Sequence, residues 1–279
     1  MKKLLLLCLA LGVFSCTSDA DDNNYDENTS DNRGTLLKSE KKIQSSGSTE
    51  WTRNYEYDTD GNISKLTMTT IYDQVIIRTF EYDINGELIS YYEDNTDAFG
   101  NKSYYYFYPE YTNGNIVNTC IEKKTDDGYD ETIDKVSFEY DANNLATSFI
   151  YFEARQLEFN TCESLSDISS AIAVSYDTNG NIIRSENSED MFSSSYLAFE
   201  YDDKNHPYAS IKPKGLMTNM LGVSTVNNQT LAEQFNAETN MSSGGNFYDY
   251  TYNLDGFPTE KRETFSFSTG TVTYEYTYY

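Results

Sequence analysis

Aspartates in a short loop are the first residues whose type and spacing could do chemistry. In "EYDTDGNISKL", Asp58, Asp60 and Asn62 place side-chain oxygens at alternate positions, as at the start of a calcium-binding loop. A complete loop needs about six ligands and an acid at its twelfth position, where this chain has Thr69. Asp-Gly and Asn-Gly pairs also suit tight hairpin turns. We therefore interpret the segment as a turn and keep a calcium-stabilised adhesin as an alternative.

A row of glutamates is the second candidate for chemistry. Each of these residues directly precedes a repeated tyrosine: Glu56, Glu81, Glu139, Glu200 and Glu275. On every second strand of a sheet such acids lie about 10 Å apart, close to the spacing used by inverting glycoside hydrolases. Any repeat with one solvated face would produce the same row. We interpret it as a solvated face, with a glycan-active hydrolase as the alternative.

Other catalytic and metal-binding patterns are missing from the sequence. His206 is the only histidine and precedes Pro207 in a broken turn, and there is no Gly-x-Ser-x-Gly motif to form a catalytic triad around it. One histidine and four cysteines do not suggest a zinc site, and there is no phosphate-binding glycine loop. We expect a non-enzymatic protein with no cofactor and no metal.

The N-terminus indicates the compartment. Lys2 and Lys3 precede an apolar run over residues 4–14, which is too short to span a bilayer. The box Val13-Phe14-Ser15-Cys16 resembles the bacterial lipoprotein signal, although Phe14 departs from the small or β-branched residue usual there. The resemblance implies a signal peptide over residues 1–15 and a lipid on Cys16. An ordinary secretory signal that is cut nearby is the alternative.

Residues 16–35 form the next predicted segment, an acidic tether without apolar periodicity. Its "SDADD" stretch resembles the export signal of surface lipoproteins in Bacteroidetes-type bacteria, which implies an outer-membrane protein exposed at the cell surface. A periplasm-facing anchor is the alternative. The formal net charge of −25 repels nucleic acids and anionic lipids. The lipid on Cys16 is therefore the expected membrane contact.

Two cysteines remain once Cys8 leaves with the signal and Cys16 carries the lipid. In an oxidising compartment Cys120 and Cys162 either pair, closing a loop of about forty residues, or stay separate thiols.

A degenerate repeat fills the rest of the chain, in one predicted domain over residues 36–279. Its unit is an aromatic strand that ends in Tyr-Asp, a turn, and a short return strand, and apolar residues alternate with polar ones as in a half-buried sheet. The anchor tyrosines are Tyr57, Tyr82, Tyr111, Tyr140, Tyr176, Tyr201, Tyr252 and Tyr276. The wide gap between Tyr201 and Tyr252 predicts that an insertion, mainly irregular or helical over residues 211–241, has replaced one unit. Thr230 and Glu233 are spaced as the capping box of a short helix over residues 230–235.

The Tyr-Asp-x-x-Gly-Asn-Ile unit at residues 57–63 and 176–182 resembles the YD-repeat, or Rhs-type, sequence. It is also similar to a group of Bacteroidetes lipoproteins for which a large curved or barrel-like antiparallel sheet is proposed. About fifteen strands exceed what an open twisted sheet usually holds, so we predict an all-β meander of hairpins that curves strongly or closes. The acids on its alternate face argue against a transmembrane barrel.

One aromatic run breaks the alternation and is the candidate binding surface. Tyr104, Tyr105, Tyr106 and Tyr108 are adjacent enough that some rings must leave the buried face. Tyrosine rings are rigid amphipathic platforms for protein or sugar contacts. We therefore predict a cell-surface lipoprotein scaffold that binds a protein or glycan partner and no nucleic acid.

Overall fold

The computed structural model describes residues 35–126, 132–142, 145–153, 162–165, 168–187, 195–212 and 226–279. The signal peptide, most of the tether and Cys16 lie outside these residues. The sixteen strands are β1 (Leu37–Ile43), β2 (Thr49–Tyr57), β3 (Ile63–Thr70), β4 (Val75–Tyr82), β5 (Leu88–Thr96), β6 (Lys102–Thr112), β7 (Asn115–Thr125), β8 (Thr132–Tyr140), β9 (Ala146–Glu153), β10 (Ile168–Tyr176), β11 (Ile182–Asn187), β12 (Ser195–Asn205), β13 (Asn227–Asn236), β14 (Ser242–Tyr252), β15 (Pro258–Phe265) and β16 (Thr271–Tyr278). A 3-10 helix, η3 (Cys162–Ser164), precedes β10.

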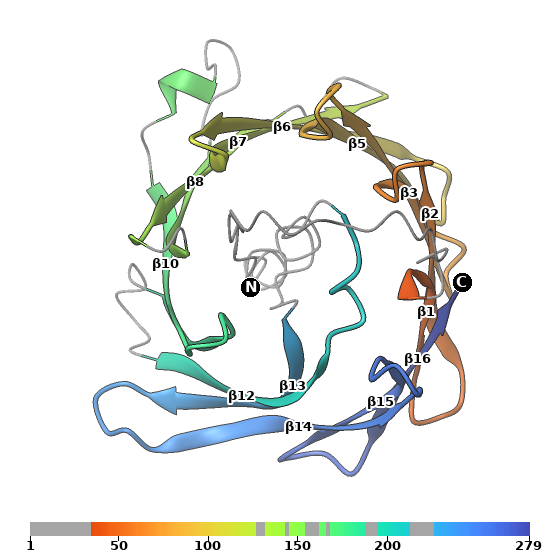
Figure 1. The fold of residues 1–279 in the computed structure, drawn as a ribbon, viewed down its shortest axis with the longest axis vertical. Coiled ribbons are helices and arrows are strands. Elements are labelled where there is room, and N and C mark those ends of the chain that lie inside the picture. Colours follow the sequence, from red (N-terminus) through yellow and green to blue (C-terminus); the bar gives the residue numbers. More distant parts are fainter. Residues whose placement is uncertain are drawn as a thin grey trace, which may run out of the picture.

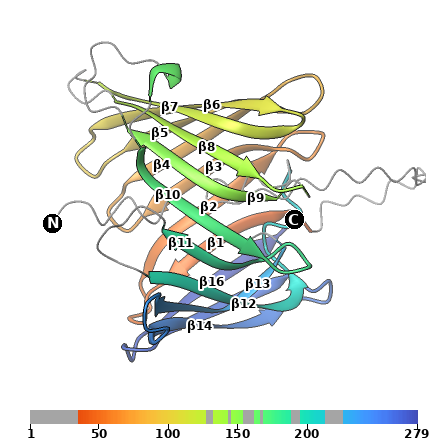
Figure 2. The same ribbon diagram turned by 90° about the vertical axis from the view of Figure 1, so that its left-hand side faces the viewer.

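The strands form a closed antiparallel barrel (Figure 1). Each strand pairs with its neighbours in the chain, and β1 closes the ring by pairing with β16, where Glu40 lies opposite Tyr276. Figure 2 shows that the strands are tilted relative to the barrel axis, as closure requires. The predicted all-β, barrel-like meander is confirmed. Within the described segments, no helix has the length and hydropathy to span a bilayer.

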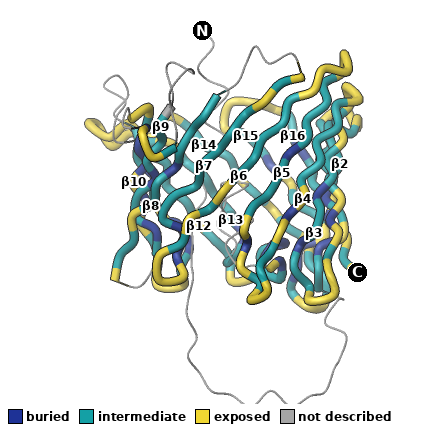
Figure 3. Tube along the Cα trace, turned by 90° about the horizontal axis from the view of Figure 1, so that it is seen from above, coloured by how far each residue is buried: buried dark blue, intermediate teal, exposed yellow. Residues whose placement is uncertain are grey.

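The two ends of the barrel differ in their turns. The Tyr-Asp turns, which lead from even to odd strands, share one end with the C-terminal residue Tyr279 and the start of β1. The turns that lead from odd to even strands lie at the opposite end. Figure 3 shows that turns at both ends are exposed, while buried positions lie along the strands.

The "DTDGN" segment is a turn whose oxygens are already engaged. Oδ1 of Asp58 accepts the amide hydrogens of Asp60 and Asn62 at 2.9 and 2.8 Å, and the Asn62 side chain donates to Oδ2. Gly61 has a φ of 81°, which L side chains rarely adopt. Asp177 makes the same contacts with Asn179 and Asn181. Nowhere in the described chain do three His, Cys, Asp or Glu residues form a group that could hold a metal ion.

The anchor tyrosines face inward and link successive hairpins. The hydroxyl groups of five of them, and that of Tyr278 instead of Tyr276 on β16, donate at 2.6–3.1 Å to a main-chain oxygen at the start of the preceding odd strand. The pairs are Tyr57 with Leu37, Tyr82 with Ile63, Tyr111 with Leu88, Tyr140 with Ile116, Tyr176 with Ala146, and Tyr278 with Pro258. The acceptor residues are buried, so each hydroxyl satisfies a carbonyl that water does not reach.

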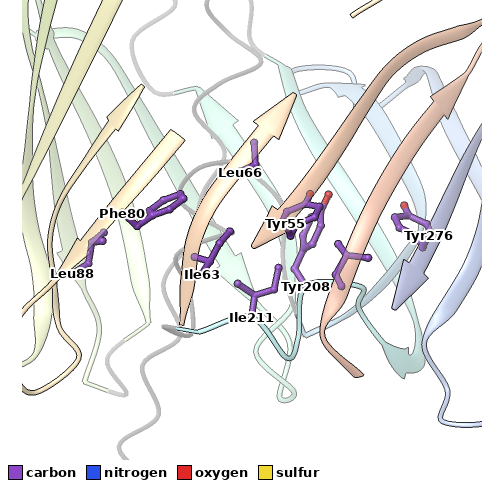
Figure 4. Packing of buried hydrophobic residues seen from close by; sticks show 9 residues of the cluster. Tyr55, Ile63, Leu66, Phe80, Leu88, Tyr208, Ile211 and Tyr276 are labelled. Carbon is purple, nitrogen blue, oxygen red and sulfur yellow. The ribbon is translucent and has the colours of Figure 1, made fainter. Parts of the chain in front are cut away.

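The larger core cluster lies inside the ring (Figure 4). Residues 206–212 run from the end of β12 into the barrel (Figure 1) and bring Tyr208 and Ile211 against Tyr55, Ile63 and Leu66. The main-chain oxygen of Lys212 accepts the Ile63 amide hydrogen at 3.1 Å. A second cluster, around Phe149 and Ile172, fills the side formed by β7–β11.

The predicted helix over residues 230–235 is wrong, because these residues lie in β13. β13 pairs with β12 and β14 along both edges, so ladder hydrogen bonds outweigh the local capping-box signal of Thr230 and Glu233. No repeat unit has been replaced either, since Tyr201 is on β12 and Tyr252 on β14, two strands apart like the other anchors. The extra length lies in the connection from β12 to β13, of which residues 213–225 fall outside the described chain.

Candidate functional site

Strand β6 divides its aromatic run between the two faces of the sheet. Phe107 stacks on Tyr91, which packs against the interior cluster, with ring centroids 4.0 Å apart. Tyr105 lies opposite Glu93, which is buried and ion-paired to Arg78. Alternation therefore places Tyr105 and Phe107 inside the barrel and Tyr104, Tyr106 and Tyr108 outside. The prediction that Tyr105 belongs to a binding surface is wrong.

A fourth tyrosine completes the outer group. Tyr92 of β5 lies opposite Tyr106, with ring centroids 5.0 Å apart, and stacks on Tyr104 at 6.0 Å with 15° between the planes. We call Tyr92, Tyr104, Tyr106 and Tyr108 the tyrosine surface. Tyr92 was not predicted, because only the register between β5 and β6 shows that it joins the group.

Two hydroxyl groups of the tyrosine surface have raised pKa values. The hydrogen bond that Tyr104 donates to Asp126 raises the pKa of Tyr104, and desolvation followed by the charge of Asp94 raises the pKa of Tyr92 to about 12. The Lys124 ammonium lies 5.0 Å from the Tyr106 ring centroid and 3.3 Å from Glu122. Neutral hydroxyls can both donate and accept hydrogen bonds, while the ring faces remain available for stacking.

A disulfide borders the tyrosine surface. Cys120 of β7, the register partner of Tyr108, is joined to Cys162 of η3 with Cα atoms 5.9 Å apart. The Lys135 ammonium donates to the main-chain oxygen of Leu165 at 3.0 Å, so residues 162–165 lie fixed over the outside of β7 and β8. The disulfide and this hydrogen bond therefore attach residues 162–165 to the outer wall beside the tyrosine surface.

The glutamates before the anchor tyrosines lie on the outer face and are exposed. Two make surface ion pairs: Glu56 with Lys65 at 3.2 Å and Glu275 with Lys41 at 3.7 Å. Each sits on a separate even strand, so these acids form a solvated row and are not gathered around one point.

A second polar group lies inside the barrel. One oxygen of Glu40 accepts hydrogen bonds from Arg53 and Tyr55 at 3.2 Å and from Tyr208 at 2.7 Å. These bonds join β1, β2 and the 206–212 segment, and they satisfy a carboxylate that is only 3% exposed. These three hydrogen bonds fix the 206–212 segment against β1 and β2.

His206 and Lys261 belong to the same interior region. Desolvation, followed by the charge of Lys261, lowers the pKa of His206 to about 3, and its Nδ1 accepts the Tyr208 amide hydrogen at 3.2 Å. Desolvation also lowers the pKa of Lys261, whose ammonium lies 3.7 Å from the Tyr274 ring centroid. The histidine is thus a neutral acceptor in a turn, which suits a structural role.

Comparisons with solved structures agree with the barrel. The chain is similar to a porin-like protein from Bacteroides uniformis, with 13% identity, a TM-score of 0.53, and coverage of 88% of this chain and 98% of that one. A porin-like protein from Bacteroides vulgatus matches at 9% identity, with a TM-score of 0.42 and coverage of 88% and 98%. The Photorhabdus luminescens Tc holotoxin pore matches at 10% identity, with a TM-score of 0.26 and coverage of 78% of this chain and 12% of that chain. No protein-family model and no curated protein matches the chain.

At this identity the first of these matches defines a class of fold, the closed antiparallel β-barrel, and nothing finer. The protein is a sixteen-stranded member of that class, with hydrophobic clusters and buried carboxylates inside the barrel and a group of tyrosines on its outer wall.

Proposed function

We propose that this protein is a non-enzymatic lipoprotein of the cell surface whose barrel presents the tyrosine surface to a protein or glycan partner. The observation that carries the proposal is that the rings of Tyr92, Tyr104 and Tyr106 pack together on the outer wall. Large aromatic side chains are more often found inside a protein. Rigid tyrosines bind with little loss of conformational entropy, and the paired strands beneath them hold the group in register.

The outer wall supports a barrel that stands outside the bilayer. A transmembrane barrel needs an apolar band on its lipid-facing side. On this wall Glu56, Glu81 and Glu275 are exposed, and the ion pairs of Glu56 and Glu275 would be costly in hydrocarbon. Membrane attachment would then come from the lipid expected on Cys16, in keeping with the lipoprotein-like start of the chain.

The candidate catalytic groups support a scaffold better than an enzyme. The repeated glutamates are solvated and spread over separate strands, and one oxygen of the interior acid Glu40 accepts three hydrogen bonds that fix the interior segment. His206 accepts the Tyr208 amide hydrogen, and its ring packs against the Tyr208 ring with centroids 4.9 Å apart, which suits a structural role.

The binding proposal is tested by isolating the acylated protein from surface membranes. Tyr104→Ala with Tyr106→Ala should remove co-purifying protein or carbohydrate, because both stacking platforms are lost. Phe247→Ala is the matched control: Phe247 is an outward, half-exposed aromatic on β14, eight strands away. Equal retention of the partner by the double variant would contradict the proposal, and protease or glycosidase treatment of the captured material identifies its class.

The lipid assignment has its own test. Cys16→Ala should abolish incorporation of a labelled fatty acid and release the protein from membranes. If the variant still incorporates the label, the lipid is attached at another residue. If the wild-type protein incorporates none, the chain starts with an ordinary secretory signal.

A further inference from the structure

Exposed apolar side chains lie on turns at both ends of the barrel, with Ile84 and Leu254 at the Tyr-Asp end and a larger group at the other. At the end opposite the C-terminus, the turns carry Phe99, Phe267 and Tyr72, which are 91%, 85% and 72% exposed. Ile71 and Met241 are exposed in the same set of turns. We call these five residues the apolar rim. Burying apolar side chains is favourable, so five of them on four turns at one end indicate a surface that is covered in use.

The turns of the apolar rim are neighbours around the ring. The strand order places the β13–β14, β15–β16, β1–β2, β3–β4 and β5–β6 turns in one continuous arc. Between the apolar tips lie small uncharged residues, including Ser45, Ser46 and Gly47. The Phe267 ring lies directly over Gly244, where a Cβ atom would overlap it, so the β15–β16 turn contacts β14 through this ring.

Charge distinguishes this arc from the opposite end. Residues 44–48, 71–74, 97–101, 237–241 and 266–270 contain only the acids Asp73, Asp97 and Glu238, and no lysine or arginine. Both oxygens of Asp97 are engaged within its own turn. At the other end, the three turns 58–62, 83–87 and 253–257 together carry five acids.

We propose that the apolar rim docks onto a zwitterionic phospholipid surface. Single side chains that protrude from separate turns can each enter a headgroup layer, and they need no complementary pocket there. The lack of lysine and arginine gives no attraction to anionic lipid, and the few acids in the arc give little repulsion from a neutral surface. Tyr72 suits this interface because its ring is apolar and its hydroxyl polar, and the Phe99 and Phe267 rings suit the apolar boundary beneath the headgroups. The inference concerns docking by the barrel itself and is independent of both the tyrosine surface and the acyl group.

The position of the rim is tested with a fluorophore at single introduced cysteines in the full-length chain. Bimane is attached at Phe99→Cys or Phe267→Cys, and as matched controls at Ile84→Cys or Leu254→Cys, which are fully exposed apolar tips at the opposite end. With phosphatidylcholine vesicles that carry nitroxide-labelled acyl chains, we expect loss of fluorescence at 99 and 267 and none at 84 and 254. No loss at the rim, or equal loss at both ends, would overturn the proposal.

The contribution of the side chains is tested separately. In the chain carrying Cys16→Ser, Phe99→Ser with Phe267→Ser should lower the partition onto phosphatidylcholine vesicles by about tenfold or more, as expected for two buried aromatic rings. Ile84→Ser with Leu254→Ser should leave the partition unchanged. Equal effects of the two pairs would refute the rim. The proposal would also be refuted if the fluorescence of bimane at position 99 or 267 fell with rising protein concentration in the absence of vesicles. A second copy of the chain would then cover the rim.

Discussion

The hydroxyl group of Tyr82 donates a 2.7 Å hydrogen bond to the main-chain oxygen of Ile63 and thereby ties the β4–β5 hairpin to the hairpin before it. The same bond recurs around much of the ring. It explains why these repeats end in tyrosine and not phenylalanine: burying Ile63 without a partner for its carbonyl would be unfavourable. The repeat therefore supplies both a hairpin of the barrel and the hydrogen bond that ties this hairpin to the one before it.

Removing this hydroxyl should weaken the barrel. We expect Tyr82→Phe to lower the free energy of unfolding by about 1–2 kcal/mol, because a buried carbonyl loses its donor. Tyr72→Phe, in an exposed turn, is the control and should change stability by less than about 0.5 kcal/mol. Urea denaturation measures both, and equal losses would contradict a specific role for the anchor hydroxyl.

The turn aspartates should act without calcium. Asp58→Ala removes the acceptor for two amide hydrogens and should cost about 1–2 kcal/mol. Asp60→Ala should cost little, because the Asp60 carboxylate is exposed and makes no hydrogen bond or ion pair within the part of the chain that the structure describes. A chelator should leave the melting temperature unchanged. A melting temperature that falls with chelator, together with equal losses for both variants, would instead favour the calcium-stabilised adhesin.

Acid should destabilise the protein through His206. The folded-state pKa is about 3, against about 6.5 in the unfolded chain, so the unfolded state binds more protons between these values. The unfolding free energy should therefore be unaffected by this group above pH 6.5, and should fall as pH drops towards 3 by up to about 1.4 kcal/mol per pH unit. His206→Asn keeps an acceptor for the Tyr208 amide and should flatten this dependence. Identical pH profiles for both proteins would refute the assignment.

The Cys120–Cys162 disulfide should contribute measurably to stability. It closes a loop with a sequence separation of 42, so Cys120→Ser with Cys162→Ser should lower the unfolding free energy by about 3–4 kcal/mol on the chain-entropy model. A reducing agent should lower the stability of the wild-type protein by a similar amount and leave the double variant unaffected. A wild-type protein insensitive to reductant would show that the bond does not constrain the unfolded chain.

Much of the fold could be predicted because the repeat carries its own signals. Period-two aromatics defined the even strands, and Gly61 with its neighbours defined the turns. The number of hairpins indicated curvature or closure. β13 was missed because its "TLAEQF" segment has helix-like local spacing, and only pairing along both edges makes it a strand.

The site was less predictable, because it depends on register and on contacts distant in sequence. Alternation along β6 shows that Tyr104 and Tyr106 share a face, but not that Tyr92 stacks on both. Likewise, Tyr208 and Glu40 are 168 residues apart, and nothing local marks their hydrogen bond. Such contacts follow from closure of the whole ring.

Photo-crosslinking tests the central proposal, that the tyrosine surface meets a partner, most directly. Tyr106 is replaced by benzoylphenylalanine in the acylated protein on intact cells, with the same replacement at Phe247 as the control on the opposite wall. The account predicts a discrete crosslinked protein or glycan from position 106 and none from position 247. No adduct at 106, or the same adducts from both positions, would contradict it.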